Sequence, residues 1–237
     1  LPIYKQLAGT GGGAALGGLI GSAFGGGKGK VLATGAGILI GGIIGNRIGA
    51  YLDQQDREKA AAAAQQAVLT GRNQSWNSNS GVSGQARVIN TKTEARAVQV
   101  PVLKGRIQEV PPLDLVGETY IATGEAKVRG GPGTDYTTVG QLDRGEAVMV
   151  AGQVQGRDWY MISQGGAGSG FVHDSLLRPA PGNTVEPSSA ANQEIETRSV
   201  SATQTCRTVK QSIKLADGSQ HEEEVTACQG PDGWKVA

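Results

Sequence analysis

The chain has 237 residues, and its 22 basic and 21 acidic side chains give a formal net charge of +1. Because phosphate binding needs a concentrated basic face, this balance argues against nucleic acid as a partner. Aromatic residues make up 4% of the chain, too few for one large soluble core, whereas the 38 glycines far exceed the usual share of about 7%.

Two ladders of glycines, spaced four residues apart, dominate the first fifty positions. Residues 9–24 also align without gaps on residues 33–48, which indicates a duplication. Spacing of four places the glycines on one helical face, and small residues let helices pack closely in a membrane. A flexible linker is the alternative, but residues 7–27 carry no charge and contain Leu, Ile and Phe. The predicted helix-packing residues are Gly9, Gly13, Gly17, Gly21, Gly25, Gly37, Gly41, Gly45 and Gly49.

These ladders resemble the glycine-zipper two-transmembrane family of bacterial envelope proteins over about residues 7–52. The resemblance implies spanning helices over 7–25 and 31–52, joined by a lysine-containing turn, with membrane lipid and further copies of the chain as partners. Glycine and alanine contribute little to membrane insertion. We therefore expect such weak spanning segments to reach the outer membrane.

A polar, alanine-rich stretch follows the second ladder. Its composition predicts a helix that continues to about Leu69 and ends at Gly71 as a C-cap. We expect Asp53 and Asp56 to face water. The helix could serve as a stalk or a surface for neighbouring copies, or simply be solvated.

Residues 120–179 consist of short alternating segments separated by glycine turns, which predicts a small barrel of about five strands. The stretch resembles the bacterial SH3-like family in Val128-Arg129, Gly131-Pro132-Gly133, Tyr136, Val139, Leu142, Gly145, Val148, Trp159-Tyr160, Gly170-Phe171-Val172 and Leu176-Leu177. This resemblance implies attachment to peptidoglycan or to envelope proteins. Tyr136, Trp159 and Tyr160 are the predicted ligand face, with barrel core as the alternative, favoured for Trp159.

The C-terminal segment contains the only two cysteines of the sequence. A turn at Ala216-Asp217-Gly218 pairs Leu215 with Ser219, and counting outward places Cys206 opposite Cys228. Side chains so placed are close enough for a disulfide, which indicates an oxidising compartment. Two free buried thiols are the alternative.

The tail after residue 204 resembles the rickettsial 17-kDa surface antigen family, as does a segment with Trp76, Asn77, Ser80, Gly81 and Gly84. The resemblance implies that residues 72–90 and 204–237 build one sheet. The SH3-like domain then interrupts this antigen-like domain, and 91–115 and 180–203 are its connectors.

Catalytic and metal sites find little support. His173 lies beside Asp174 and Ser175, but consecutive residues do not easily converge on one substrate atom. His221 lies beside a run of three glutamates, and the two histidines and two cysteines lack zinc-ligand spacing. We expect no enzyme activity, no cofactor and no metal.

The sequence thus predicts a membrane-anchored α+β protein. Its expected segments are a transmembrane hairpin with a helical extension (1–70), the first antigen-like part (71–117), the SH3-like domain (118–179), a flexible linker (180–203) and the C-terminal hairpin (204–237). The predicted function is structural, with oligomers in the outer membrane and soluble domains in the periplasm that bind peptidoglycan or an envelope complex. A pore-forming oligomer is the alternative.

Overall fold

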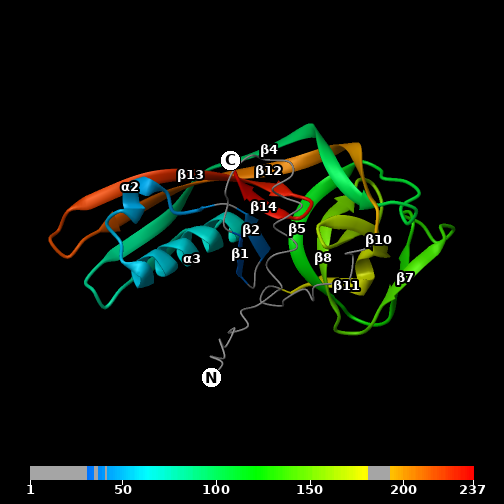
Figure 1. The fold of residues 1–237 in the computed structure, drawn as a ribbon, viewed down its shortest axis with the longest axis horizontal. Coiled ribbons are helices and arrows are strands. Elements are labelled where there is room, and N and C mark those ends of the chain that lie inside the picture. Colours follow the sequence, from blue (N-terminus) through cyan, green and yellow to red (C-terminus); the bar gives the residue numbers. More distant parts are fainter. Residues whose placement is uncertain (1–30, 35–36, 41, 181–192) are drawn as a thin grey trace, which may run out of the picture.

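The computed structural model describes residues 31–34, 37–40, 42–180 and 193–237. Two lobes lie side by side and share one long antiparallel strand pair (Figure 1). The elements are β1 (Val31–Thr34), β2 (Gly37–Ile40), α2 (Asn46–Gly49), α3 (Gln54–Thr70), β3 (Gln74–Asn77), β4 (Ser83–Leu103), β5 (Leu113–Ala122), β6 (Ala126–Arg129), β7 (Thr138–Leu142), β8 (Ala147–Val154), β9 (Trp159–Gln164), β10 (Ala167–His173), the 3-10 turn η1 (Asp174–Leu176), β11 (Leu177–Pro179), β12 (Ile195–Lys214), β13 (Gln220–Gly230) and β14 (Gly233–Val236).

The shared pair consists of β4 and β12, which run antiparallel from Ile195↔Leu103 to Lys214↔Ser83. At one end the pair belongs to the helix lobe, which also contains α2, α3, β3, β13 and β14. At the other end it packs on the barrel lobe, β5–β11. The register shifts between Thr208 and Val209, so that Ile89 has no partner on β12. Such a bulge bends and twists its strand.

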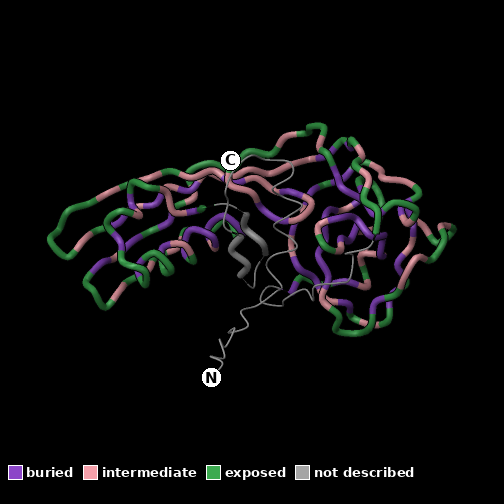
Figure 2. The backbone as a smooth tube through the Cα atoms, in the orientation of Figure 1, coloured by how far each residue is buried: buried purple, intermediate pink, exposed green. Residues whose placement is uncertain are grey.

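The two ends of the pair bury opposite faces. On β12, Val209 and Ile213 lie in the helix lobe, whereas Val200 and Ala202 lie against the barrel. Successive side chains on a strand point to opposite faces, so odd and even positions cannot serve the same core. Figure 2 shows the resulting concentration of buried residues in the two lobes.

Helix α3 lies against the sheet through a stripe of small residues. On its buried face, Ala64 and Ala67 lie in the core cluster of Trp234, and Ala60 lies in the neighbouring cluster of Ile213. Asp53 caps the N-terminus by accepting a 2.8 Å hydrogen bond from the backbone N–H of Asp56. The helix ends where the sequence predicts, because Gly71 is its C-cap with φ +68°.

Two expectations for this helix were wrong. It begins at Gln54 as a separate element, and it packs on the sheet instead of standing in solvent. Asp56 is 2% exposed, and one of its carboxylate oxygens accepts a 2.9 Å hydrogen bond from the Ser80 hydroxyl. A run with alanine on every face hides the helix's packing side from sequence inspection.

The predicted membrane-anchored α+β fold is wrong. Residues 31–34 and 37–40 form the antiparallel strands β1 and β2, and β2 pairs parallel with β14 at Trp234↔Leu39. Glycine weakens a helix by about 1 kcal/mol per residue, and isoleucine and valine favour strands. Pairing with the free edge of β14 is therefore favoured over helix formation in this segment. The described ranges contain no helix that has both the length and the apolar character required to cross a bilayer.

The predicted glycine packing face does not form in the second ladder. Gly37 lies in β2, Gly45 precedes α2 and Gly49 is the last residue of α2. A Cβ atom at Gly45 would lie 1.4 Å from the Glu223 carboxylate, which accepts a hydrogen bond from the N–H of Ile48. The first predicted helix, with Gly9, Gly13, Gly17, Gly21 and Gly25, lies outside the described residues, as does Gly41.

The C-terminal hairpin has the register that its turn predicts. Leu215 donates to Ser219, Gly218 has φ +87°, and Cys206 lies opposite Cys228 in a disulfide. Strand β14 returns along β13, and β12 joins β3–β4 into one sheet. The expected linker 180–203 differs, because β12 already begins at Ile195 and pairs with β4 from there.

Arg207 connects helix, sheet and barrel. Its guanidinium donates to the carbonyl of Leu69 at 2.9 Å and lies 4.9 Å from the Trp234 ring. Glu118 on β5 is close enough to act on its charge: burial raises the pKa of Glu118, and Arg207 opposes that rise. One side chain thus satisfies the end of α3 and faces the other lobe.

We predict that Arg207→Met lowers the free energy of unfolding by about 1–3 kcal/mol, because buried carbonyls at the end of α3 lose their donor. Urea unfolding followed by circular dichroism measures the change. Arg72→Met is the control, since its exposed side chain has no partner among the described residues. Equal unfolding midpoints for the two variants would contradict this role.

Candidate functional site

The barrel lobe is a strongly curved antiparallel sheet with the strand order β11-β5-β8-β9-β10-β6-β7. Its interior contains Val128, Leu142, Val148, Val172 and Leu177, all of which are apolar positions of the SH3-like pattern. The glycine-rich segment 165–170 is mostly strand. Gly165 and Gly166, with φ +59° and +86°, make a two-residue turn, and β10 starts at once.

The three predicted ligand aromatics do not share a face. Tyr160 points into the barrel interior, where its ring centroid lies 5.2 Å from that of Tyr120. Trp159, the next residue on β9, points to the outer face, where it packs at the margin of the core shared with β4 and β12. Both rings are thus half-buried and pack against a core cluster, Trp159 on the side of β4 and β12 and Tyr160 inside the barrel. Tyr136 lies in the loop between β6 and β7.

The β6–β7 loop is held by arginines. Arg129 donates to the Tyr136 carbonyl at 2.9 Å, and Arg157, from the β8–β9 turn, donates to the Pro132 carbonyl at 3.2 Å. The Tyr136 ring lies over Gly131, where a Cβ atom would approach it to 2.3 Å. Glycine at this position is therefore a packing requirement.

The Tyr136 hydroxyl donates a hydrogen bond to the carboxylate of Glu109. This bond raises the pKa of Tyr136, and burial adds to the rise, while Arg157 beside the hydroxyl lowers it. Glu109 belongs to the connector between β4 and β5. The loop therefore brings together a phenol, a carboxylate and a guanidinium from three separate segments.

The connector of residues 104–112 lies along the barrel. The N–H of Gln108 donates to the Gly130 carbonyl at 2.7 Å, and Arg106 donates to the Val139 carbonyl at 2.9 Å. From β12, Arg198 donates to the Ile107 carbonyl at 3.1 Å. The expected connector 91–115 is thus shorter, since β4 runs to Leu103 and β5 starts at Leu113, and its remaining part builds one side of the loop that carries Tyr136.

Trp159 and His173 form a half-buried aromatic pair. They lie opposite each other on β9 and β10, with ring centroids 5.5 Å apart in an edge-on arrangement. We call Tyr136, Arg157, Trp159 and His173 the barrel-end surface. It combines flat apolar rings with one cation and neutral hydrogen-bonding groups, a combination suited to binding a sugar or peptide.

The histidines do not assemble a catalytic set among the described residues. The Nδ1 atom of His173 lies 2.8 Å from the Ser175 hydroxyl and 3.4 Å from the Asp174 carboxylate. Both groups approach the same nitrogen, so Asp174 does not orient the ring for a proton transfer to Ser175. The contacts are instead those of a cap on η1. His221 stacks on Tyr51 at 3.7 Å.

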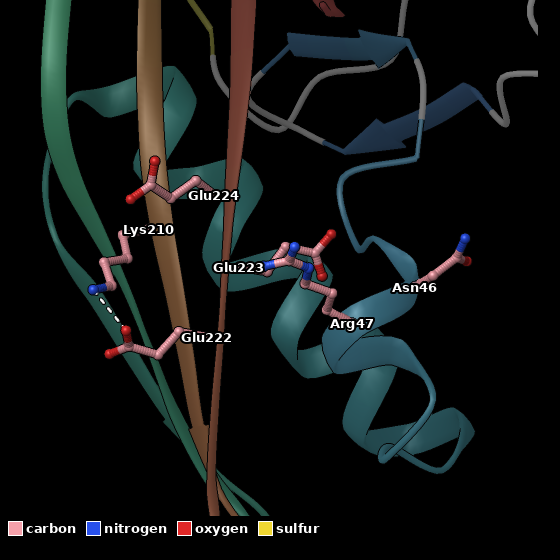
Figure 3. A pocket seen from close by; sticks show the side chains of 6 residues that line it. All are labelled: Asn46, Arg47, Lys210, Glu222, Glu223 and Glu224. Carbon is pink, nitrogen blue, oxygen red and sulfur yellow. Dashed lines mark ion pairs between the residues drawn. The ribbon is translucent and has the colours of Figure 1, made fainter.

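A charged hollow of about 590 Å³ lies between α2 and β13. Lys210 and Glu222 form a 2.6 Å ion pair across one face of the hairpin, while Glu223 reaches the start of α2 on the other face (Figure 3). Its lining residues are Asn46, Arg47, Lys210, Glu222, Glu223 and Glu224. These contacts give three of the charged side chains structural roles. The described residues contain no group of three His, Cys, Asp or Glu side chains that could hold a metal ion.

Sequence reasoning missed Arg157 and His173 as parts of this surface, and Glu109 as the acceptor of the Tyr136 hydroxyl. The alternation of β9 and β10 predicts that His173 lies beside Trp159, once the hairpin register is known. Arg157 follows Gly156 in a turn, where an exposed cation is common. For Glu109 no local signal exists, because its place depends on how the connector packs against the barrel.

Comparison with known proteins supports the barrel assignment. Residues 124–178, which span β6 to β11, match the family model of the bacterial SH3 domain. A search of curated proteins found no significant match to the chain. The barrel lobe therefore contains a bacterial SH3 domain, to which β5 adds a strand that starts before the matched segment, at Leu113.

We predict that Glu109→Gln lowers the pKa of Tyr136, because the carboxylate that stabilises the protonated phenol is lost while Arg157 remains. In the parent chain the raised pKa stabilises the fold below about pH 10, the pKa of an unfolded tyrosine, and this contribution disappears as the pH rises through the folded value.

Ultraviolet difference titration measures tyrosine ionisation, and Tyr136→Phe identifies the step that belongs to this residue. Glu125→Gln, a change at an exposed carboxylate of the same lobe, is the matched control. If Tyr136 ionised at the same pH in the parent chain, in Glu109→Gln and in Glu125→Gln, the assigned hydrogen bond would be contradicted.

Proposed function

We propose that this chain is a structural protein of the bacterial cell envelope that attaches to peptidoglycan through its SH3 domain. The family match at residues 124–178 carries the proposal, because bacterial SH3 domains commonly bind cell-wall material. The protein binds without chemical conversion. An envelope protein complex is the alternative partner of the same domain.

The barrel-end surface supports this role. Trp159 and Tyr136 offer ring faces for sugar units, and Arg157 offers donors to the carboxylates of peptide stems. The side chain of Trp159 is half-buried, so its ring is already held in place before a ligand arrives. A preorganised ring loses little conformational freedom on binding.

The periplasm is the proposed location of both lobes. A disulfide persists in an oxidising compartment, and Cys206 and Cys228 form one in the hairpin. The proposed antigen-like domain is the helix lobe, supported by the pairing of residues 83–103 with 195–214 and by the return of β14. Attachment to the outer membrane remains a prediction that depends on residues outside the described ranges.

We expect the full chain to sediment with purified peptidoglycan and Trp159→Ala to lose at least about tenfold in affinity, because a central aromatic contact is removed. Arg178→Ala, on β11, is the control and binds like the parent. Circular dichroism verifies that both variants are folded.

Two outcomes count against this proposal in different ways. Failure of the parent chain to sediment with peptidoglycan rejects wall binding altogether. Sedimentation that is equal for the parent and Trp159→Ala rejects the barrel-end surface as the binding face.

A further inference from the structure

The middle of β4 has an open edge. On the side away from β12, β3 pairs with β4 only as far as Ala86, and the Asn73 side chain accepts from the N–H of Val88 at 2.9 Å. The next neighbour on that side is β10, at Gly168↔Val102. Between these points no strand of the described residues pairs with this edge.

The open edge is also exposed. Of residues 89–97 only Glu94 is half-buried, and the others are exposed. Figure 1 shows this part of β4 passing over the top of the molecule between the lobes. An edge with unpaired backbone N–H and C=O groups is a template for another strand. Ile89, the bulge residue, leaves 48% of its surface exposed at the end of this segment.

A second copy of the same strand can pair here only in a few registers. Two-fold symmetry requires antiparallel pairing, and residues directly opposite each other must share a face of the sheet. The two-fold axis therefore lies midway between two copies of one residue, which is the centre of the register. Centring on Lys92 places two lysines opposite each other. Centring on Glu94 opposes two glutamates and also places each Lys92 opposite an arginine, at position 96. Like charges directly opposite each other are destabilising.

Centring on Ala95 avoids a clash but leaves each Lys92 opposite a valine. Centring on Thr93 removes every clash of charge and opposes Lys92 to an unlike charge. Each Lys92 then lies opposite Glu94 of the second copy, and each Asn90 lies opposite Arg96. Within one chain Lys92 and Glu94 already form a 2.6 Å ion pair on one face of the strand. Pairing two copies in this register builds an alternating square of two lysines and two glutamates.

We propose that two copies of this chain associate edge to edge through antiparallel pairing of their β4 strands over Asn90–Arg96. The two copies of Thr93 lie opposite each other across the two-fold axis. The seven paired residues span about 23 Å at 3.3 Å per residue. Beyond Asn90 the bulge at Ile89 bends the strand and ends the regular edge. The contact uses a surface separate from the barrel-end surface, so it does not depend on wall binding.

Lysines and bulges also occur on edges that are protected from pairing. The sequence here differs from a purely protective one, because its charges alternate in sign with the period that self-pairing requires. A protective edge predicts a monomer, which makes the two explanations separable by the oligomeric state of the full chain.

Charge reversal tests the register. Lys92→Glu places glutamate opposite glutamate in both symmetric pairs, and Glu94→Lys places lysine opposite lysine. We expect each variant alone to raise the dimer dissociation constant at least about tenfold. In an equimolar mixture of the two variants every opposed pair is again of opposite sign, so a mixed dimer forms. Sedimentation velocity of the full chains measures all three samples.

The mixing design separates the interface from the ion pair within one chain. Both single variants lose the internal Lys92–Glu94 pair, and mixing does not restore it. Lys214→Glu makes the same charge change at an exposed position of β12, away from the open edge. It is the control and dimerises like the parent. A monomeric parent at high protein concentration, unaffected single variants, or a mixture that stays monomeric would each overturn the proposal.

Discussion

The antiparallel pairing of β4 with β12 is the constraint on which the rest of this structure depends. One continuous ladder passes through both lobes, so each lobe must accept the face that the strand alternation presents to it. On β12 that alternation gives odd residues to the helix lobe and even residues to the barrel. The bulge at Ile89 shifts β4 by one position, so its even residues Ala86 and Val100 face opposite lobes.

Local sequence signals predicted those elements whose partners are close in the chain. The turn before Ser219 fixes the register of the β12–β13 hairpin, and with it the position of both cysteines. The second glycine ladder failed for the opposite reason. Its spacing is compatible with a helix, but the segment's strands depend on β14, nearly two hundred positions later. Periodicity describes one segment and carries no information about a distant sheet edge that competes for it.

The candidate site divides in the same way. Adjacent residues on a strand must point to opposite faces, so Trp159 and Tyr160 could not both belong to one ligand surface. This much follows from the sequence once β9 is recognised as a strand. The contribution of Glu109 does not, because the connector reaches Tyr136 only through contacts with Gly130 and β12. Such contacts between distant segments leave no local pattern.

The junction between the lobes explains how a barrel inserted in the sequence keeps a defined place. Where β13 leaves β12, the side-chain amide of Gln229 accepts from the N–H of Thr205 at 3.1 Å, while the Gln229 carbonyl accepts from Gln204 at 2.6 Å. On β5, Gly117 lies so close to the β13–β14 turn that a Cβ atom at this residue would lie 2.6 Å from the Gly230 carbonyl. Backbone contacts of this closeness tolerate little displacement. A ligand held at the barrel end would therefore also orient the helix lobe and the exposed middle of β4.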